Sequence, residues 1–72
     1  MTKAQTSLIA DAVAAGLNVS ESATCVTIRT GKTRRSAGLH LWPNGTATRS
    51  DADASVCSAI RSVAAMRRVV GL

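Results

Sequence analysis

The sequence contains no phenylalanine, no tyrosine and a single tryptophan, Trp42, so its apolar residues are mostly alanine and valine. Small side chains bury little surface each, and burial stabilises a fold by only about 25 cal/mol per Å² of apolar area. Seventy-two residues suffice for one domain, spanning 1–72, and not for two. We therefore expect one domain with a thin core and modest stability, or one that gains stability by self-association.

Groups suited to catalysis and to metal binding are also scarce. The chain has four Asp and Glu residues and one histidine, His40, and no spacing among them indicates an acid/base pair. The two cysteines, Cys25 and Cys57, are far apart in the sequence and form no C-x-x-C pair, so they cannot supply a four-ligand metal site. These absences predict a protein that is not an enzyme, needs no cofactor or metal, and keeps both cysteines as buried free thiols.

Long hydrophobic runs are absent as well. The apolar stretch 8–17 is interrupted by Asp11 and is too short to cross a bilayer. No convincing small-residue cleavage site follows it, as a secretory signal would require. We expect a cytoplasmic protein with no membrane partner.

Positive charge is the most distinctive feature that the sequence does have. Nine Lys and Arg residues against four Asp and Glu give a net charge of +5. Four of the cations lie within seven residues, at Arg29, Lys32, Arg34 and Arg35. Such an excess favours a polyanionic partner or an acidic protein surface.

The apolar periodicity predicts a helix over residues 4–15. Thr2 and Gln5 have the spacing of a capping box at its start, and Gly16 followed by Leu17 is typical of a Schellman motif at its end. A second cap over 50–53, Ser-Asp-Ala-Asp, predicts another helix that runs to about Val70.

Between the two predicted helices the apolar period is two, which is typical of strands. Residues 22–30 and 37–42 alternate and are joined by a turn over 31–35. The stretch 42–45, Trp-Pro-Asn-Gly, fits a type I turn and returns the chain as a short third strand over 46–49. The expected fold class is α+β, a two-layer sandwich of order α-β-β-β-α in which two helices cover one face of a three-stranded antiparallel meander.

The stretch Gly31-Lys32-Thr33 raises the possibility of a nucleotide phosphate loop. That motif requires a glycine five residues before Gly31, where this sequence has Val26, and a helix after the lysine, where this sequence predicts a strand. A nucleotide-hydrolysing loop is therefore not expected. Two interpretations remain: a basic finger that follows a phosphate backbone, and a turn whose charges keep it solvated.

The uncovered sheet face carries the other candidate residues. Alternation places Arg29, His40 and Trp42 on this face, with Arg49 if the third strand keeps register. An aromatic ring among cations suits single-stranded nucleic acid, but Trp42 before a proline also fits a plug at the core edge. Arg68 is the cation of the second helix best placed to help, although the helix dipole alone favours cations there.

The helix, three strands, helix order and the basic charge resemble the double-stranded-RNA-binding domain, which implies binding to an RNA phosphate backbone. That family has a lysine cluster at the start of its second helix, where this chain has Ser50, Asp51, Ala52 and Asp53, so none of its binding residues is carried over. In size, alanine content and lack of catalytic residues the chain also resembles small accessory proteins of temperate phages, which implies a bacterial or phage-infected host cell and a host protein as target.

Two functional hypotheses follow. The first is a nucleic-acid-binding module that contacts phosphates through loop 29–35 and the open sheet face, and the second is a phage-type inhibitor that binds an acidic surface of a host protein complex. An open sheet and a small core also allow a homodimer. Under either hypothesis the same set of candidate binding residues applies: Arg29, Lys32, Arg34, Arg35, His40, Trp42, Arg49 and Arg68.

Overall fold

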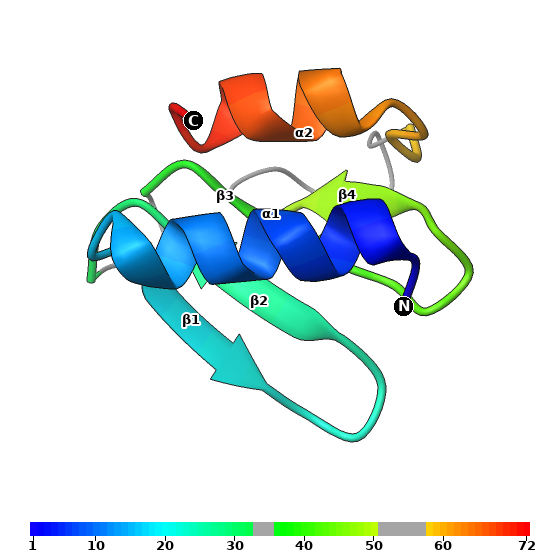
Figure 1. Cartoon of the computed structure of the whole chain (residues 1–72), viewed down its shortest axis with the longest axis horizontal. Helices are drawn as coiled ribbons and strands as arrows, with labels where there is room; N and C mark the ends of the chain where they lie inside the picture. The colour runs from blue at the N-terminus through cyan, green and yellow to red at the C-terminus, as the bar shows by residue number, and fades with distance from the viewer. Residues whose placement is uncertain (33–35, 51–57) are drawn as a thin grey trace.

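The protein forms a two-layer α+β fold with two helices packed on a four-stranded antiparallel sheet (Figure 1). The structure is a computed structural model, and it describes residues 1–32, 36–50 and 58–72. The elements in chain order are α1 (Lys3–Ala14), β1 (Asn18–Glu21), β2 (Val26–Arg29), β3 (Gly38–Leu41), β4 (Ala47–Arg49) and α2 (Val63–Val69). The sheet order is β1-β2-β3-β4, so each strand pairs with its sequence neighbour. The predicted α+β class and the position of a helix before and after the sheet are confirmed.

Local hydrogen bonds define both ends of α1 as the sequence predicts. The Thr2 hydroxyl accepts from the Gln5 N–H at 3.1 Å, and the Gln5 side-chain oxygen accepts from the Thr2 N–H at 3.0 Å, which completes the capping box. At the other end the N–H groups of Gly16 and Leu17 donate to the carbonyls of Val13 and Ala12. These are the two bonds of a Schellman motif, and Gly16 has the positive φ of 79° that the motif requires.

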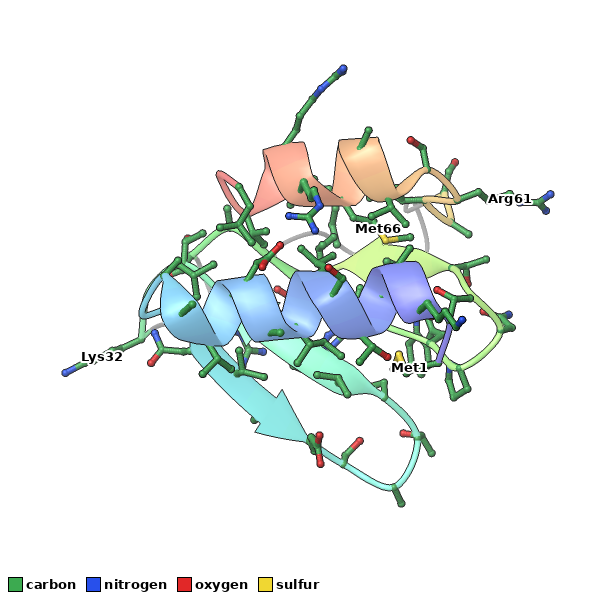
Figure 2. All side chains as sticks on the ribbon, in the orientation of Figure 1. Met1, Lys32, Arg61 and Met66 are labelled. Carbon is green, nitrogen blue, oxygen red and sulfur yellow. The ribbon has the colours of Figure 1, made fainter. Side chains whose placement is uncertain are left out.

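The core lies between the helices and one face of the sheet. Cross-strand partners on that face are Val26 with Leu41 and Ile28 with Leu39, and all four are buried. From the helix layer, Leu8 and Met66 are fully buried against them, and Figure 2 shows Met66 between α2 and the sheet. The buried apolar residues are Leu8, Ala12, Val26, Ile28, Leu39, Leu41, Ala47, Met66 and Val70. Because both helices contribute to this one cluster, they cover the same sheet face.

The sheet contains one strand more than the predicted meander. The predicted strand over 22–30 begins only at Val26, because residues 22–25 form a tight turn in which the Ser22 N–H donates to the Cys25 carbonyl at 2.9 Å. The Ser22 hydroxyl accepts from the N–H groups of Thr24 and Cys25 and holds this turn closed. Because of this turn, residues 18–21 form a separate strand, β1, and β2 runs back antiparallel to it. Cys25 is a half-buried free thiol, whereas Cys57 is outside the described residues.

The second helix is shorter than predicted. Residues 58–62 are not helical; instead Ile60 pairs with Ala47 at the outer edge of β4, where each N–H donates to the carbonyl of the other residue. The helix begins at Val63 after Ser62, whose hydroxyl accepts from the Ala65 N–H. The backbone pair of Ile60 with Ala47 extends the sheet, so residues 58–62 do not form the helical turn predicted for them. Most of the predicted cap at 50–53 lies outside the described residues.

The only buried polar residue among those described is Gln5, which joins α1 to the sheet. Its side-chain nitrogen donates to the carbonyls of Trp42, at 2.9 Å, and Thr46, at 3.2 Å. Its oxygen is occupied by the Thr2 N–H of the capping box. The amide therefore has a partner for each donor hydrogen, as a buried polar group requires.

The turn after β3 forms at the predicted position. The Gly45 N–H donates to the Trp42 carbonyl at 3.2 Å, and the Trp42 N–H donates to Thr46 at 2.9 Å. Gly45 has φ 93°, which only glycine adopts readily. Asn44 accepts from the Thr46 N–H and stabilises the same turn. No helix in the described part of the chain is long and apolar enough to cross a membrane.

Candidate nucleic-acid interface

The sheet face opposite the helices, called the open face here, is lined by polar side chains. The register aligns Ser20, Thr27, His40 and Thr48 as direct neighbours across the four strands. Their side chains lie on the face opposite the buried residues that alternate with them. A row of hydroxyl groups and one imidazole therefore crosses the whole width of the sheet.

Hydrogen bonds fix the orientation of the two ring side chains on the open face. The Thr27 hydroxyl and the His40 Nδ1 lie 2.9 Å apart, and the Trp42 indole N–H donates to the Thr48 hydroxyl at 3.0 Å. The two rings are tilted by 52° with centroids 6.1 Å apart. Trp42 is half-buried and is not a member of the core cluster. Of the two interpretations of Trp42, the structure favours a surface residue of the open face.

Arg29 lies on the open face, and the aliphatic part of its side chain packs over Gly38 on the neighbouring strand. Gly38 is its direct partner on β3, and a Cβ at Gly38 would lie only 2.6 Å from the Ile28 carbonyl and 3.0 Å from the Arg29 Cγ. Any larger residue at position 38 would displace the arginine stem. The arginine Nε is buried and has no hydrogen-bond partner among the described residues.

A hollow of about 450 Å³ adjoins Arg29 at the end of β1. It is lined by Leu17, Asn18, Val19, Ser20 and Arg29. Arg29 contributes a guanidinium group, and Asn18 and Ser20 contribute an amide and a hydroxyl. Such groups are common ligands of phosphate oxygens. Asn18 and Ser20 were not among the predicted binding residues, because β1 itself was not predicted.

The electrostatic environment of His40 disfavours its charged form. Partial burial lowers the pKa of the imidazole below its usual 6.5, and the positive charge of Arg29 lowers it further. His40 is consequently neutral at pH 7 and can accept or donate one hydrogen bond at each ring nitrogen.

In the described part of the chain, negative charge lies on the helix side of the sheet. Asp11 on α1 forms an ion pair with Arg67 of α2, with 2.8 Å between Oδ2 and Nη2. Glu21 pairs opposite the buried Val26 and therefore lies on the helix side of the sheet edge. Among the described residues the open face has no carboxylate and has Arg29 as its cation.

The remaining predicted residues are distributed over several regions. Lys32 is exposed and projects away from the body of the protein at the end of the β2–β3 hairpin (Figure 2). Arg34 and Arg35 are outside the described residues. Arg68 is exposed on α2, in the layer behind the sheet. The structure thus places Lys32 at the hairpin end and Arg68 in the helix layer.

The predicted position of Arg49 is wrong. Arg49 pairs opposite Leu39, whose side chain is buried under the helices, so Arg49 lies on the helix side of the sheet. The register explains the difference: the turn aligns His40 with Thr48, and Thr48 therefore occupies the open-face position expected for Arg49. The loop geometry, not the local sequence of β4, determines this register.

No group of three or more His, Cys, Asp or Glu side chains within the described ranges could hold a metal ion. Comparison of the chain with protein-family models, with curated proteins and with solved structures found no match.

Proposed function

We propose that the protein is a small non-enzymatic module that binds the phosphate backbone of nucleic acid through the loop 29–35 and the open face. The observation that carries the proposal is the absence of any described carboxylate from the open face. The described carboxylates, Asp11 and Glu21, lie on the helix side, whereas the open face has a cation and neutral hydroxyl groups. A polyanion can approach this face without meeting a described negative charge.

Arg29 is the central contact in this proposal. Its stem is held over Gly38, and its side chain lines the hollow beside β1. A phosphate oxygen in that hollow would gain a charge-assisted hydrogen bond from the guanidinium group. Lys32, exposed at the hairpin end, adds a second charge that attracts phosphate with no fixed geometry.

Single-stranded nucleic acid fits the open face better than a duplex. The face has a half-buried indole, Trp42, and a neutral imidazole, His40, with fixed ring orientations. Unpaired bases can contact such rings while their phosphates contact cations. A duplex presents its bases only through its grooves and would use these rings poorly.

The test is fluorescence anisotropy with labelled single- and double-stranded DNA and RNA at two salt concentrations. The informative variant changes Lys32, Arg34 and Arg35 to glutamate. Its matched control changes Lys3, Arg61 and Arg68 to glutamate, because these residues give the same change in net charge and lie outside the loop, Lys3 on α1, Arg68 on α2 and Arg61 shortly before α2. We expect micromolar affinity for single strands that decreases steeply with salt and is lost in the loop variant alone.

Two results would contradict the proposal. Equal loss of affinity in both triple variants would mean that net charge alone attracts nucleic acid and that no interface exists. Absence of binding to all four nucleic acids at low salt would favour the alternative, an acidic protein surface as the partner, as expected for a phage-type inhibitor.

A further inference from the structure

Strand β1 forms one edge of the sheet and has an outer side that no described residue pairs with. The Ser22 N–H donates to Cys25 across the turn that joins β1 to β2. Hydrogen-bonded and non-bonded pairs alternate along an antiparallel ladder, so Ser20 and Asn18 also bond to β2. The N–H and C=O groups of Val19 and Glu21 consequently point away from the sheet.

Several features that block an exposed edge are missing from β1, although the strand is short and has one charged residue, Glu21. Natural proteins protect such edges with short strands, charged side chains, proline, a bulge or a covering segment. The four residues of β1, Asn-Val-Ser-Glu, include neither proline nor lysine, and their register with β2 is continuous. This edge can therefore accept another strand.

An apolar flank of α1 adjoins this edge. The other flank of α1 faces α2, because Asp11 on that flank forms an ion pair with Arg67 of α2. At 100° per residue, Ile9 and Val13 lie on the side of α1 that faces away from α2, and α1 contacts β1. Val13 is 60% exposed, more than any other large hydrophobic residue in the described part of the chain. Ile9, together with Val19 of β1, is only partly buried.

We propose that a second copy of this chain binds here, with its own β1 antiparallel to the first. The self-complementary register places Ser20 of both copies on the two-fold axis and Val19 opposite Glu21 of the second copy. Each Val19 and Glu21 pair then exchanges two backbone hydrogen bonds, so the interface contains four. The result is one eight-stranded sheet with both open faces on the same side.

Charge and area favour a second copy as the occupant. Two chains of net charge +5 associate most readily through a surface with few cations. The apolar flank of Ile9, Val13 and Val19 contains none, and the nearby Arg29 lies on the open face of the sheet. Stable interfaces bury about 600 to 1,000 Å² on each partner. A four-residue strand alone buries less, so the packing of Val13 and its neighbours between the two copies is necessary to reach that size.

The test is sedimentation velocity over a wide concentration range, with two variants and one control. Glu21→Pro removes an outward N–H that the monomer does not use, so the monomer fold tolerates it. Val13→Lys places a charge on the exposed apolar flank. Ser7→Lys is the control, because Ser7 is also exposed on α1 but lies on another side of the helix. We expect a dimer whose dissociation constant increases at least tenfold in each variant and less than twofold in the control.

Hydrogen exchange distinguishes a dimer formed through β1 from a dimer formed through any other surface. In the dimer the amides of Val19 and Glu21 should exchange at least tenfold more slowly than after dilution to monomer. A chain that remains monomeric at millimolar concentration, or a dimer in which these two amides are unprotected, would overturn the proposal. If circular dichroism shows that Glu21→Pro is unfolded, Val13→Lys and the exchange rates decide the question. Neither readout depends on nucleic-acid binding.

Discussion

The two faces of the sheet are made by the same strands and differ in nearly every physical respect. On the helix side, Ile28, Leu39 and Leu41 are fully buried and have only apolar neighbours in the core cluster. On the open side, Thr27 and His40 alternate with them and form a hydrogen bond at 2.9 Å. The difference arises from the period of two along a strand, which directs consecutive side chains to opposite faces.

This contrast indicates which face stabilises the fold and which is available for recognition. Burial of apolar area stabilises the helix side, whereas a part-buried side-chain hydrogen bond contributes about 1 kcal/mol of net stability because folding exchanges it for bonds to water. The open-face side chains are nevertheless oriented, since Trp42 and His40 each have a side-chain partner. Substitutions on the helix side should therefore mainly reduce stability, whereas substitutions on the open face should mainly reduce binding affinity.

The largest expected effect is on the helix side. Leu39→Ala should reduce the free energy of unfolding by about 2 to 5 kcal/mol, because it removes a fully buried side chain and leaves a cavity. The adjacent open-face change, His40→Ala, should cost about 1 kcal/mol or less. Urea denaturation of both variants measures the difference. Similar losses would show that the two faces do not differ in stability as described.

The next effect concerns Gln5, the polar link between α1 and the sheet. Gln5→Ala should cost about 1 to 3 kcal/mol, since it leaves the Trp42 and Thr46 carbonyls without their donor. Gln5→Glu should be more destabilising at pH 7 than at pH 4, because an ionised carboxylate would face those two carbonyl oxygens. Thermal unfolding at both pH values provides the measurement. A pH-independent loss would mean that the side chain rotates into solvent.

Binding should show the opposite contrast between the two layers. Arg29→Ala should weaken affinity for a single-stranded oligonucleotide about tenfold, equivalent to roughly 1.4 kcal/mol. Arg68→Ala, which changes an exposed arginine of α2 behind the sheet, should change it less than twofold. Anisotropy titrations at one fixed salt concentration compare the two. Equal losses of affinity in the two variants would mean that the open face is not the binding interface.

The smallest expected effect is the pH dependence due to His40. Its pKa in the folded protein lies below the usual 6.5, so the unfolded chain binds the proton first as the pH decreases. Stability should therefore be complete above pH 6.5 and decrease slightly below it, while affinity for nucleic acid increases because the protonated ring adds a cation. His40→Gln should remove both trends. Chemical denaturation and anisotropy between pH 5 and 8 would detect them.

The parts of the fold that depend on neighbouring residues could be predicted from the sequence. The capping box of Thr2 and Gln5, the Schellman motif at Gly16 and the turn at Gly45 all join atoms within five residues of each other. The hairpin of β2 and β3 followed from strong alternation on both sides of a turn. These features require no knowledge of what packs against them.

The candidate site was predictable only in part. Arg29, His40 and Trp42 share the open face because the alternation of two strong strands fixes their direction. Asn18 and Ser20 were missed because β1 contains a single apolar residue, Val19, too little for a periodic signal. Arg49 was misplaced because its direction depends on the register that the β3–β4 turn sets.

By itself, then, the sequence determined α1 with both its ends, the turn after β3, the paired strands β2 and β3, and the excess of positive charge. Only the tertiary structure decided that β1 forms, that Ile60 extends the sheet in place of a helical turn, and that the Gln5 amide reaches the Trp42 carbonyl. The physical reason is the separation along the chain. Bonds between near neighbours form whatever surrounds them, whereas a weak strand or a buried amide is stable only when a distant segment supplies its hydrogen-bond partner.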